Sequence, residues 1–88
     1  MARKLQDLVI SSLAEGLTIY IKQKKIPFFI VSLKQGKGYI EVRVEGEKNI
    51  AKFFLKDRED AEKFVEDLKA LNFLTEGYKE RGVYAFIP

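Results

Sequence analysis

The chain has 88 residues, 47% of them hydrophobic and 12% aromatic, and it carries 16 Lys and Arg against 13 Asp and Glu. A chain of this length forms a single core, since it buries only roughly 60–65% of its unfolded surface on folding, and this composition excludes a disordered protein. The absence of cysteine excludes a disulfide framework and a thiolate metal site. No run approaches the roughly 18 apolar residues of a membrane span, and no signal-peptide core follows Met1, so we expect one cytoplasmic domain over residues 1–88.

The first predicted element is a long helix over residues 3–25. Its polar residues recur at intervals of three and four, which places them on one stripe about 80° wide at roughly 100° per residue. This stripe consists of Lys4, Asp7, Ser11, Glu15, Thr18, Lys22 and Lys25. Pro27 ends the helix, and Lys22, Lys24 and Lys25 favour its C-terminus electrostatically. In a second interpretation Gly16 ends a shorter helix and residues 17–21, which alternate β-formers, make a strand.

Apolar and small residues fill the rest of this helix. They are Leu5, Leu8, Val9, Ser12, Leu13, Gly16, Leu17, Tyr20 and Ile21. This arc is wider than one face of a small sheet can cover, and an uncovered apolar surface is typical of an interface between chains. The helix therefore predicts a homo-oligomer, a dimer or larger.

Three strands are predicted next, over residues 28–34, 39–45 and 50–56. The turn formers Gly36 and Gly38 separate the first two, and Gly46 and Asn49 separate the second from the third. Closely spaced strands with short turns predict an antiparallel meander.

A second helix is predicted over residues 57–71. Asp57 caps its start, and Asn72 stops it after a single apolar stripe. Two weaker strands over residues 74–79 and 83–87, joined through Gly82, form a terminal hairpin. The order of elements predicts an α+β domain in which a mainly antiparallel sheet is packed by two helices.

The residue types argue for a binding protein rather than an enzyme. Histidine and cysteine, the usual agents of proton transfer and nucleophilic attack near neutral pH, are absent. Glu41, Arg43 and Glu45 share one strand face, where paired carboxylates could hold a metal in a carboxylate-dependent nuclease. Alternating charges are, however, typical of the solvated face of a strand, and the loop around Gly36 lacks the spacing of a phosphate-binding loop. We expect no catalytic residue, no cofactor and no metal.

The strands of the meander have two contrasting faces. One is uniformly apolar and predicts a core face: Phe29, Val31, Leu33, Ile40, Val42, Val44, Ala51, Phe53 and Leu55. The other mixes aromatic, charged and aliphatic residues: Phe28, Ile30, Ser32, Lys34, Tyr39, Glu41, Arg43, Glu45, Ile50, Lys52 and Phe54. Aromatic rings that stack bases beside cations that neutralise phosphates are typical of single-strand binding. The residues predicted to bind nucleic acid are Phe28, Lys34, Lys37, Tyr39, Arg43, Lys52 and Phe54.

This second face has an alternative interpretation as a buried layer. Aromatic and aliphatic residues with scattered charges also form subunit interfaces, so the chain could be a structural or regulatory subunit that binds protein. The two interpretations are compatible where a dimer walls a basic channel.

Charge is distributed unevenly along the chain. Residues 1–56 hold 11 Lys and Arg against 5 Asp and Glu, whereas residues 57–88 hold 5 against 8. A basic surface attracts a polyanion, and the acidic second helix should lie away from it. The abundance of Lys and Glu, with few Asn and Gln, is typical of hyperthermophiles.

The order of helix, meander, helix and hairpin, together with the outward aromatics, resembles the archaeal ThermoDBP-related single-stranded DNA-binding proteins. The resemblance spans most of the chain but includes no signature motif and no extended leucine-zipper tail. It implies an oligomer that binds single-stranded DNA without strong sequence preference through aromatic and basic residues. The spacing of residues does not distinguish DNA from RNA.

Overall fold

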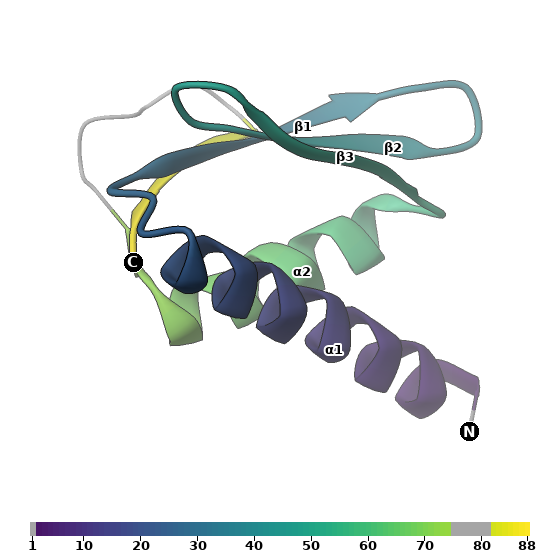
Figure 1. Cartoon of the computed structure of the whole chain (residues 1–88). Helices are drawn as coiled ribbons and strands as arrows, with labels where there is room; N and C mark the ends of the chain where they lie inside the picture. Colours follow the sequence, from purple (N-terminus) through teal and green to yellow (C-terminus); the bar gives the residue numbers. More distant parts are fainter. Residues whose placement is uncertain (1, 75–81) are drawn as a thin grey trace.

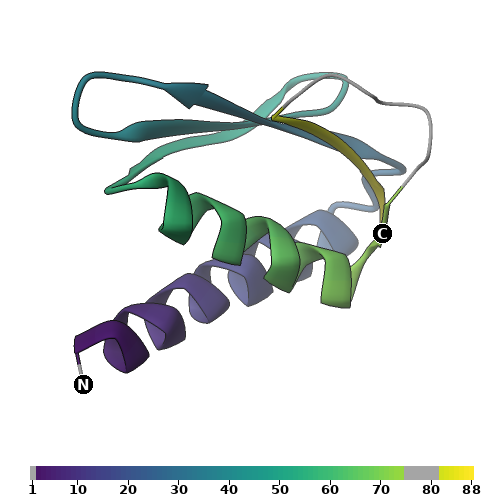
Figure 2. The same cartoon turned by 180° about the vertical axis from the view of Figure 1, so that it is seen from behind.

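Two helices lie on one face of an antiparallel sheet in the computed structural model, which describes residues 2–74 and 82–88 (Figures 1 and 2). The elements are α1 (Ala2–Gln23), β1 (Phe29–Gln35), β2 (Ile40–Glu45), β3 (Asn49–Leu55), α2 (Arg58–Leu71), β4 (Phe73–Leu74) and β5 (Val83–Ile87). The predicted α+β class and the meander are therefore confirmed. Residues 75–79 of the predicted penultimate strand lie outside the described residues.

The strand order in the sheet is β3-β2-β1-β5-β4, with every neighbouring pair antiparallel. The last strand, β5, therefore pairs with the edge of β1 that does not contact β2. Short turns close the meander: between β1 and β2 the Gly36 amide donates to the Tyr39 carbonyl at 2.8 Å, and Gly38 adopts a φ of 82°. A positive φ of this kind favours glycine, which explains the turn signal in the sequence.

The predicted apolar face of the meander is the core face. All nine of its residues are buried or packed against the buried cluster. Phe29 stacks on Phe86 from β5 with ring centroids 5.2 Å apart, and Phe53 meets Phe64 from α2 edge-on at 5.0 Å. These ring pairs connect the sheet with the helix layer and with the last strand.

Ile50 corrects the assignment of the two faces. It was predicted on the face opposite the core, whereas the structure packs it partly buried against the core cluster. The pairing of β2 with β3 shifts between Val44 and Glu45, so that Glu45 pairs with Asn49 and Ile50 is the extra residue. A bulge of this kind breaks the two-residue alternation on which the prediction depended.

Helix α1 continues through Gly16, so the interpretation with a strand over residues 17–21 is wrong. Its rotation about its own axis also differs from simple amphipathic expectation. Thr18 on the polar stripe is only 4% exposed, and its hydroxyl accepts a hydrogen bond from the side-chain amide of Asn72 at 3.2 Å. Ser11 donates to the Asp67 carboxylate of α2 at 3.0 Å, and part of the polar stripe therefore faces α2 rather than water.

The end of α1 is closed by two backbone hydrogen bonds. The Ile26 amide donates to the Ile21 carbonyl and the Lys25 amide donates to the Lys22 carbonyl, both at 3.1 Å. This is a Schellman motif, in which the residue after the cap is left-handed and is usually glycine. Here that residue is Lys25, with a φ of 56°.

Replacing Lys25 by glycine is therefore expected to stabilise the protein by about 1 kcal/mol, because glycine adopts the left-handed conformation without the clash of a Cβ atom. Urea denaturation measures the change. Lys22→Gly is the matched control, since it removes the same charge from a position inside the helix and should cost about 1 kcal/mol. Equal loss of stability in both variants would contradict the motif.

Helix α2 begins and ends as predicted. The Asp57 carboxylate accepts a hydrogen bond from the backbone amide of Asp60 at 3.0 Å, and the backbone amide of Asn72 donates to the Leu68 carbonyl at 2.8 Å. The apolar stripe between these caps, which includes Phe64 and Leu68, is buried. Neither α1 nor α2 is long and apolar enough to cross a membrane within the described part of the chain.

Candidate nucleic-acid interface

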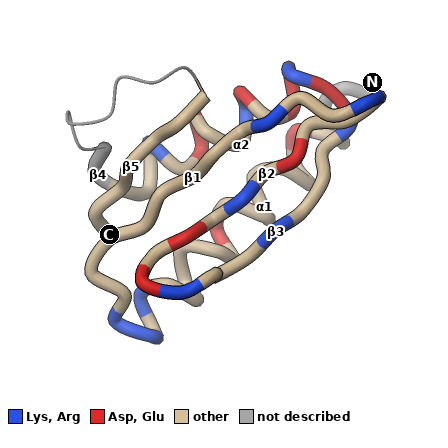
Figure 3. Tube along the Cα trace, turned by 90° about the horizontal axis from the view of Figure 1, so that it is seen from above, with Lys and Arg blue, Asp and Glu red and all other residues tan. Residues whose placement is uncertain are grey.

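The sheet has an outer face, the one that the helices leave uncovered. Alternation along the strands places Lys34, Arg43, Lys52 and Phe54 on it, at the positions between the core residues. Figure 3 looks onto this face and shows acidic and basic residues alternating along β2 beside a basic residue on β3. The seven residues predicted to bind nucleic acid are all exposed: Phe28, Lys34, Lys37, Tyr39, Arg43, Lys52 and Phe54.

Two aromatic rings form a pair at one end of the outer face. Tyr39 and Phe54 meet edge-on with centroids 5.2 Å apart, and they are 39% and 57% exposed. The Tyr39 ring lies over the β1–β2 turn, where a Cβ atom at Gly36 would overlap it. The absence of a Cβ atom at position 36 therefore allows the ring to lie close to the backbone, with much of both rings open to solvent.

The two cations beside this pair, Arg43 and Lys52, both form ion pairs with one carboxylate. Glu41 accepts a hydrogen bond from the Arg43 guanidinium at 2.9 Å, and its other oxygen lies 3.8 Å from the Lys52 ammonium. The Glu41 side chain is only 16% exposed, whereas those of Arg43 and Lys52 are 45% and 53% exposed. The two cations therefore share a partially covered anion and keep about half of their own surface free for a ligand.

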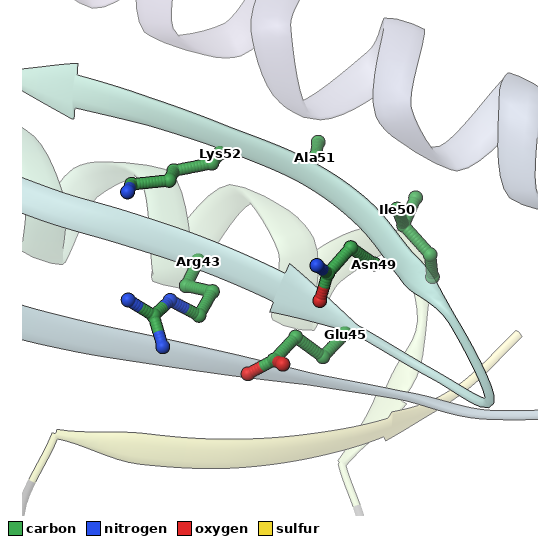
Figure 4. Close-up of a pocket in the computed structure, with 6 residues that line it drawn as sticks. All are labelled: Arg43, Glu45, Asn49, Ile50, Ala51 and Lys52. Atoms are coloured by element: carbon green, nitrogen blue, oxygen red, sulfur yellow. The ribbon is translucent and has the colours of Figure 1, made fainter.

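Lys52 also links the cations to the aromatic pair. Its ammonium lies 5.9 Å from the centroid of the Phe54 ring, within the range of a cation–π contact. Arg43 and Lys52 are cross-strand neighbours, and Figure 4 shows their side chains extending in the same direction from adjacent strands. An exposed aromatic ring and two cations thus lie within one or two residues of each other on the sheet.

A depression of about 400 Å³ continues from these cations along β3. Its lining consists of Arg43, Glu45, Asn49, Ile50, Ala51 and Lys52 (Figure 4). A second depression of about 460 Å³ lies between the end of α1 and the β2–β3 turn, lined by Tyr20, Lys24, Lys25, Ile26, Pro27, Glu47, Lys48, Asn49 and Ile50. Because both include Asn49 and Ile50, the two depressions adjoin at the bulge.

The second depression contains candidate residues that were not predicted. Lys24, Lys25 and Lys48 bring three cations to one corner of the molecule, and the Lys24 ammonium lies 5.9 Å from the Tyr20 ring centroid. The run of lysines at residues 22–25 was visible in the sequence but was explained by the helix dipole. Only the fold brings it beside Lys48, which lies more than twenty residues further along the chain.

Phe28 belongs to this second end of the outer face. It precedes the buried Phe29 and is 42% exposed. It lies six residues from Lys34, which is level with Glu41 and Phe54, so Phe28 is separated from the aromatic pair by about 20 Å at roughly 3.3 Å per residue. The predicted residues therefore form two ends of one surface rather than a single cluster.

The carboxylates of β2 do not form a pair. Glu41 and Glu45 are four residues apart on one strand, a separation of about 13 Å at roughly 3.3 Å per residue, which is too long to share a proton or a metal ion. Among residues 2–74 and 82–88 no group of three potential metal ligands lies together.

No protein-family model, no curated protein and no solved structure matches this chain.

Proposed function

We propose that the outer face of the sheet binds single-stranded nucleic acid without strong sequence preference, with DNA rather than RNA as the ligand that the resemblance implies. The observation that carries the proposal is the exposed Tyr39–Phe54 pair beside Arg43 and Lys52. Every base has a π-face, so stacking on exposed rings tolerates any sequence, while cations track the phosphates. Stacking of this kind requires unpaired bases, which favours single strands over a duplex. The resemblance to the ThermoDBP-related proteins supports the same function.

The two depressions define a path for the bound strand across the surface. It would run from the aromatic pair past Arg43 and Lys52 to the corner formed by Lys24, Lys25 and Lys48. The outer face supplies about 20 Å of this path, which accommodates a site near the lower limit of the roughly 4–16 nucleotides held by single-strand binding domains.

The electrostatic contribution follows from the charges on this path. On the outer face, Lys34, Lys37, Arg43 and Lys52 oppose Glu41 and Glu45, which leaves a surplus of two positive charges. At the corner, three lysines oppose Glu47, which leaves two more. A surplus of this size gives binding that weakens steeply with salt, because bound phosphates release their counterions.

Fluorescence anisotropy with labelled oligo-dT over a series of salt concentrations tests this function, with duplex DNA and single-stranded RNA of equal length as competitors. Arg43→Ala and Lys52→Ala should each reduce the slope of log K against log salt by about 0.7, the value for one phosphate contact on a single strand. Lys69→Ala on α2 is the matched control and should leave the slope unchanged. Binding that is insensitive to salt would instead favour the protein-binding alternative.

The acidic helix gives a second prediction. Glu62 and Glu66 are exposed on α2, which covers the inner face of the sheet. Glu62→Gln combined with Glu66→Gln should leave oligo-dT binding intact or strengthen it slightly, because the change removes only distant like-charge repulsion. A large loss of affinity in the folded double variant would show that the strand binds on the helix side.

A further inference from the structure

Helix α1 carries an apolar surface that the described residues of the rest of the chain leave open. This surface, the α1 outer face, consists of Leu5, Leu8, Val9, Ser12, Leu13, Gly16, Ile19 and Tyr20, all of them exposed. Leu5 is 67% exposed and Leu8 is 60% exposed. At the same time the polar Thr18 of the same helix is buried. A helix that buries a threonine while six large apolar side chains face outward is typical of a chain with a missing partner.

We propose that the α1 outer face binds the same face of a second copy of this chain, with the two helices antiparallel about a two-fold axis near Ser12. The outer face of the sheet points away from the helix layer and stays uncovered in such a dimer (Figure 1). The two proposed surfaces share Tyr20, which also lines the second depression.

The size of the face fits a pair of identical chains. The exposed fractions of its six large side chains correspond to at most about 600 Å² on one copy, and a pair could bury at most about 1,200 Å² from them, which is the lower end of the roughly 1,200–2,000 Å² buried in stable interfaces. A face of one copy that binds itself also gives a closed dimer rather than an open filament.

The shape of the face favours the antiparallel arrangement. Bulky residues occupy its N-terminal half, where Leu8, Val9, Ser12 and Leu13 line a shallow apolar depression, and Gly16 follows one turn later with open space where a Cβ atom would be. About an axis near Ser12, Leu8 and Val9 come level with Gly16 of the partner subunit, so large side chains meet a gap. A parallel pair would set Gly16 against Gly16 of the partner subunit and leave a void, which packed interfaces avoid.

Sedimentation equilibrium at micromolar concentration tests the dimer. The unmodified chain should show twice the 10.2 kDa of one copy. Leu8→Lys combined with Val9→Lys should give a folded species of one-copy mass, with folding checked by circular dichroism. Leu71→Lys is the matched control, because Leu71 is an apolar residue of α2 with 40% exposure outside the face, and it should keep the dimer. A one-copy mass for the unmodified chain, or a dimer in the double variant, would overturn the proposal.

Gly16→Leu is a second variant whose folding is not in question, since leucine favours the helix more than glycine and meets only open space within one copy. It should raise the dissociation constant of the dimer by about tenfold or more, because it fills the gap that the partner occupies. An unchanged constant would place the contact elsewhere.

The absence of cysteine allows the orientation to be measured with single introduced thiols. Ser12→Cys lies near the axis and should form a covalent dimer with a short thiol cross-linker. Leu5→Cys alone should not, whereas Leu5→Cys mixed with Ile19→Cys should form a heterodimer. Efficient cross-linking of Leu5→Cys to itself would indicate a parallel pair and refute the antiparallel arrangement.

Discussion

Replacing Tyr39 or Phe54 by alanine is expected to weaken oligo-dT binding by about 1–3 kcal/mol, the usual contribution of one base stacked on an aromatic ring. Both rings are partly exposed and contact each other at the end of the outer face. A cross-strand pair of this kind contributes only roughly 0.2–1 kcal/mol to folding, so the melting temperature should change little. Anisotropy titrations and thermal melts of the same preparations measure both quantities.

Two controls make the result specific. Phe54→Tyr keeps a ring at the position and should retain most of the affinity. Gly36→Ala leaves both rings in the sequence but displaces Tyr39 from the turn, because a Cβ atom there overlaps its ring. It should therefore weaken binding in the same direction as Tyr39→Ala. Unchanged affinity in both alanine variants, each folded, would exclude the aromatic pair from the binding site.

The elements and the core of this protein follow from local features of its sequence. Gly36 and Gly38 mark the turn between β1 and β2, Asp57 marks the start of α2, and two-residue alternation identifies the core face of β1, β2 and β3. Each of these signals acts over a few residues, so it was readable without knowledge of the fold. Within these three strands the alternation failed at Ile50, where the bulge inserts an extra residue that no local pattern announces.

The rotation of α1 was not predictable in the same way. Its polar residues are satisfied by groups more than fifty residues away, such as the Asn72 amide that donates to Thr18 and the Asp67 carboxylate that accepts from Ser11. Periodicity reports that a helix has two faces, and it does not report which face finds partners. As a result the sequence predicted that the helix carries an excess of apolar surface, but only the fold shows which apolar residues stay exposed and which are buried.

The candidate site was predictable as a set of residues but not as an arrangement. Strand alternation placed Arg43, Lys52 and Phe54 together, as the structure has them. The role of Glu41 was not foreseen, since its contacts with both cations depend on the register of β2 against β3. The lysine corner depends on a contact between a helix end and a distant turn, which composition alone does not contain.

Phe64→Ala is expected to have the largest effect on folding. This residue of α2 is fully buried, and its ring meets Phe53 of β3 edge-on at 5.0 Å, which makes it a direct contact between the helix layer and the sheet. Removing a buried phenylalanine ring costs about 3–5 kcal/mol, because apolar contacts are lost and a cavity remains. That cost is comparable with the lower end of the roughly 5–15 kcal/mol that stabilises a small domain, so much of the variant should be unfolded or melt at a strongly reduced temperature.

Phe54→Ala provides the matched comparison, since it removes the same kind of ring from the outer face, at the residue next to Phe53 on β3. The two variants should separate the two faces of the sheet: Phe64→Ala loses stability, and Phe54→Ala loses affinity for oligo-dT while remaining folded. Urea denaturation at one fixed protein concentration measures the first quantity, because the stability of an associating chain depends on concentration. If Phe54→Ala were as destabilising as Phe64→Ala, the outer face would be a second buried layer, and base stacking at this position would be refuted.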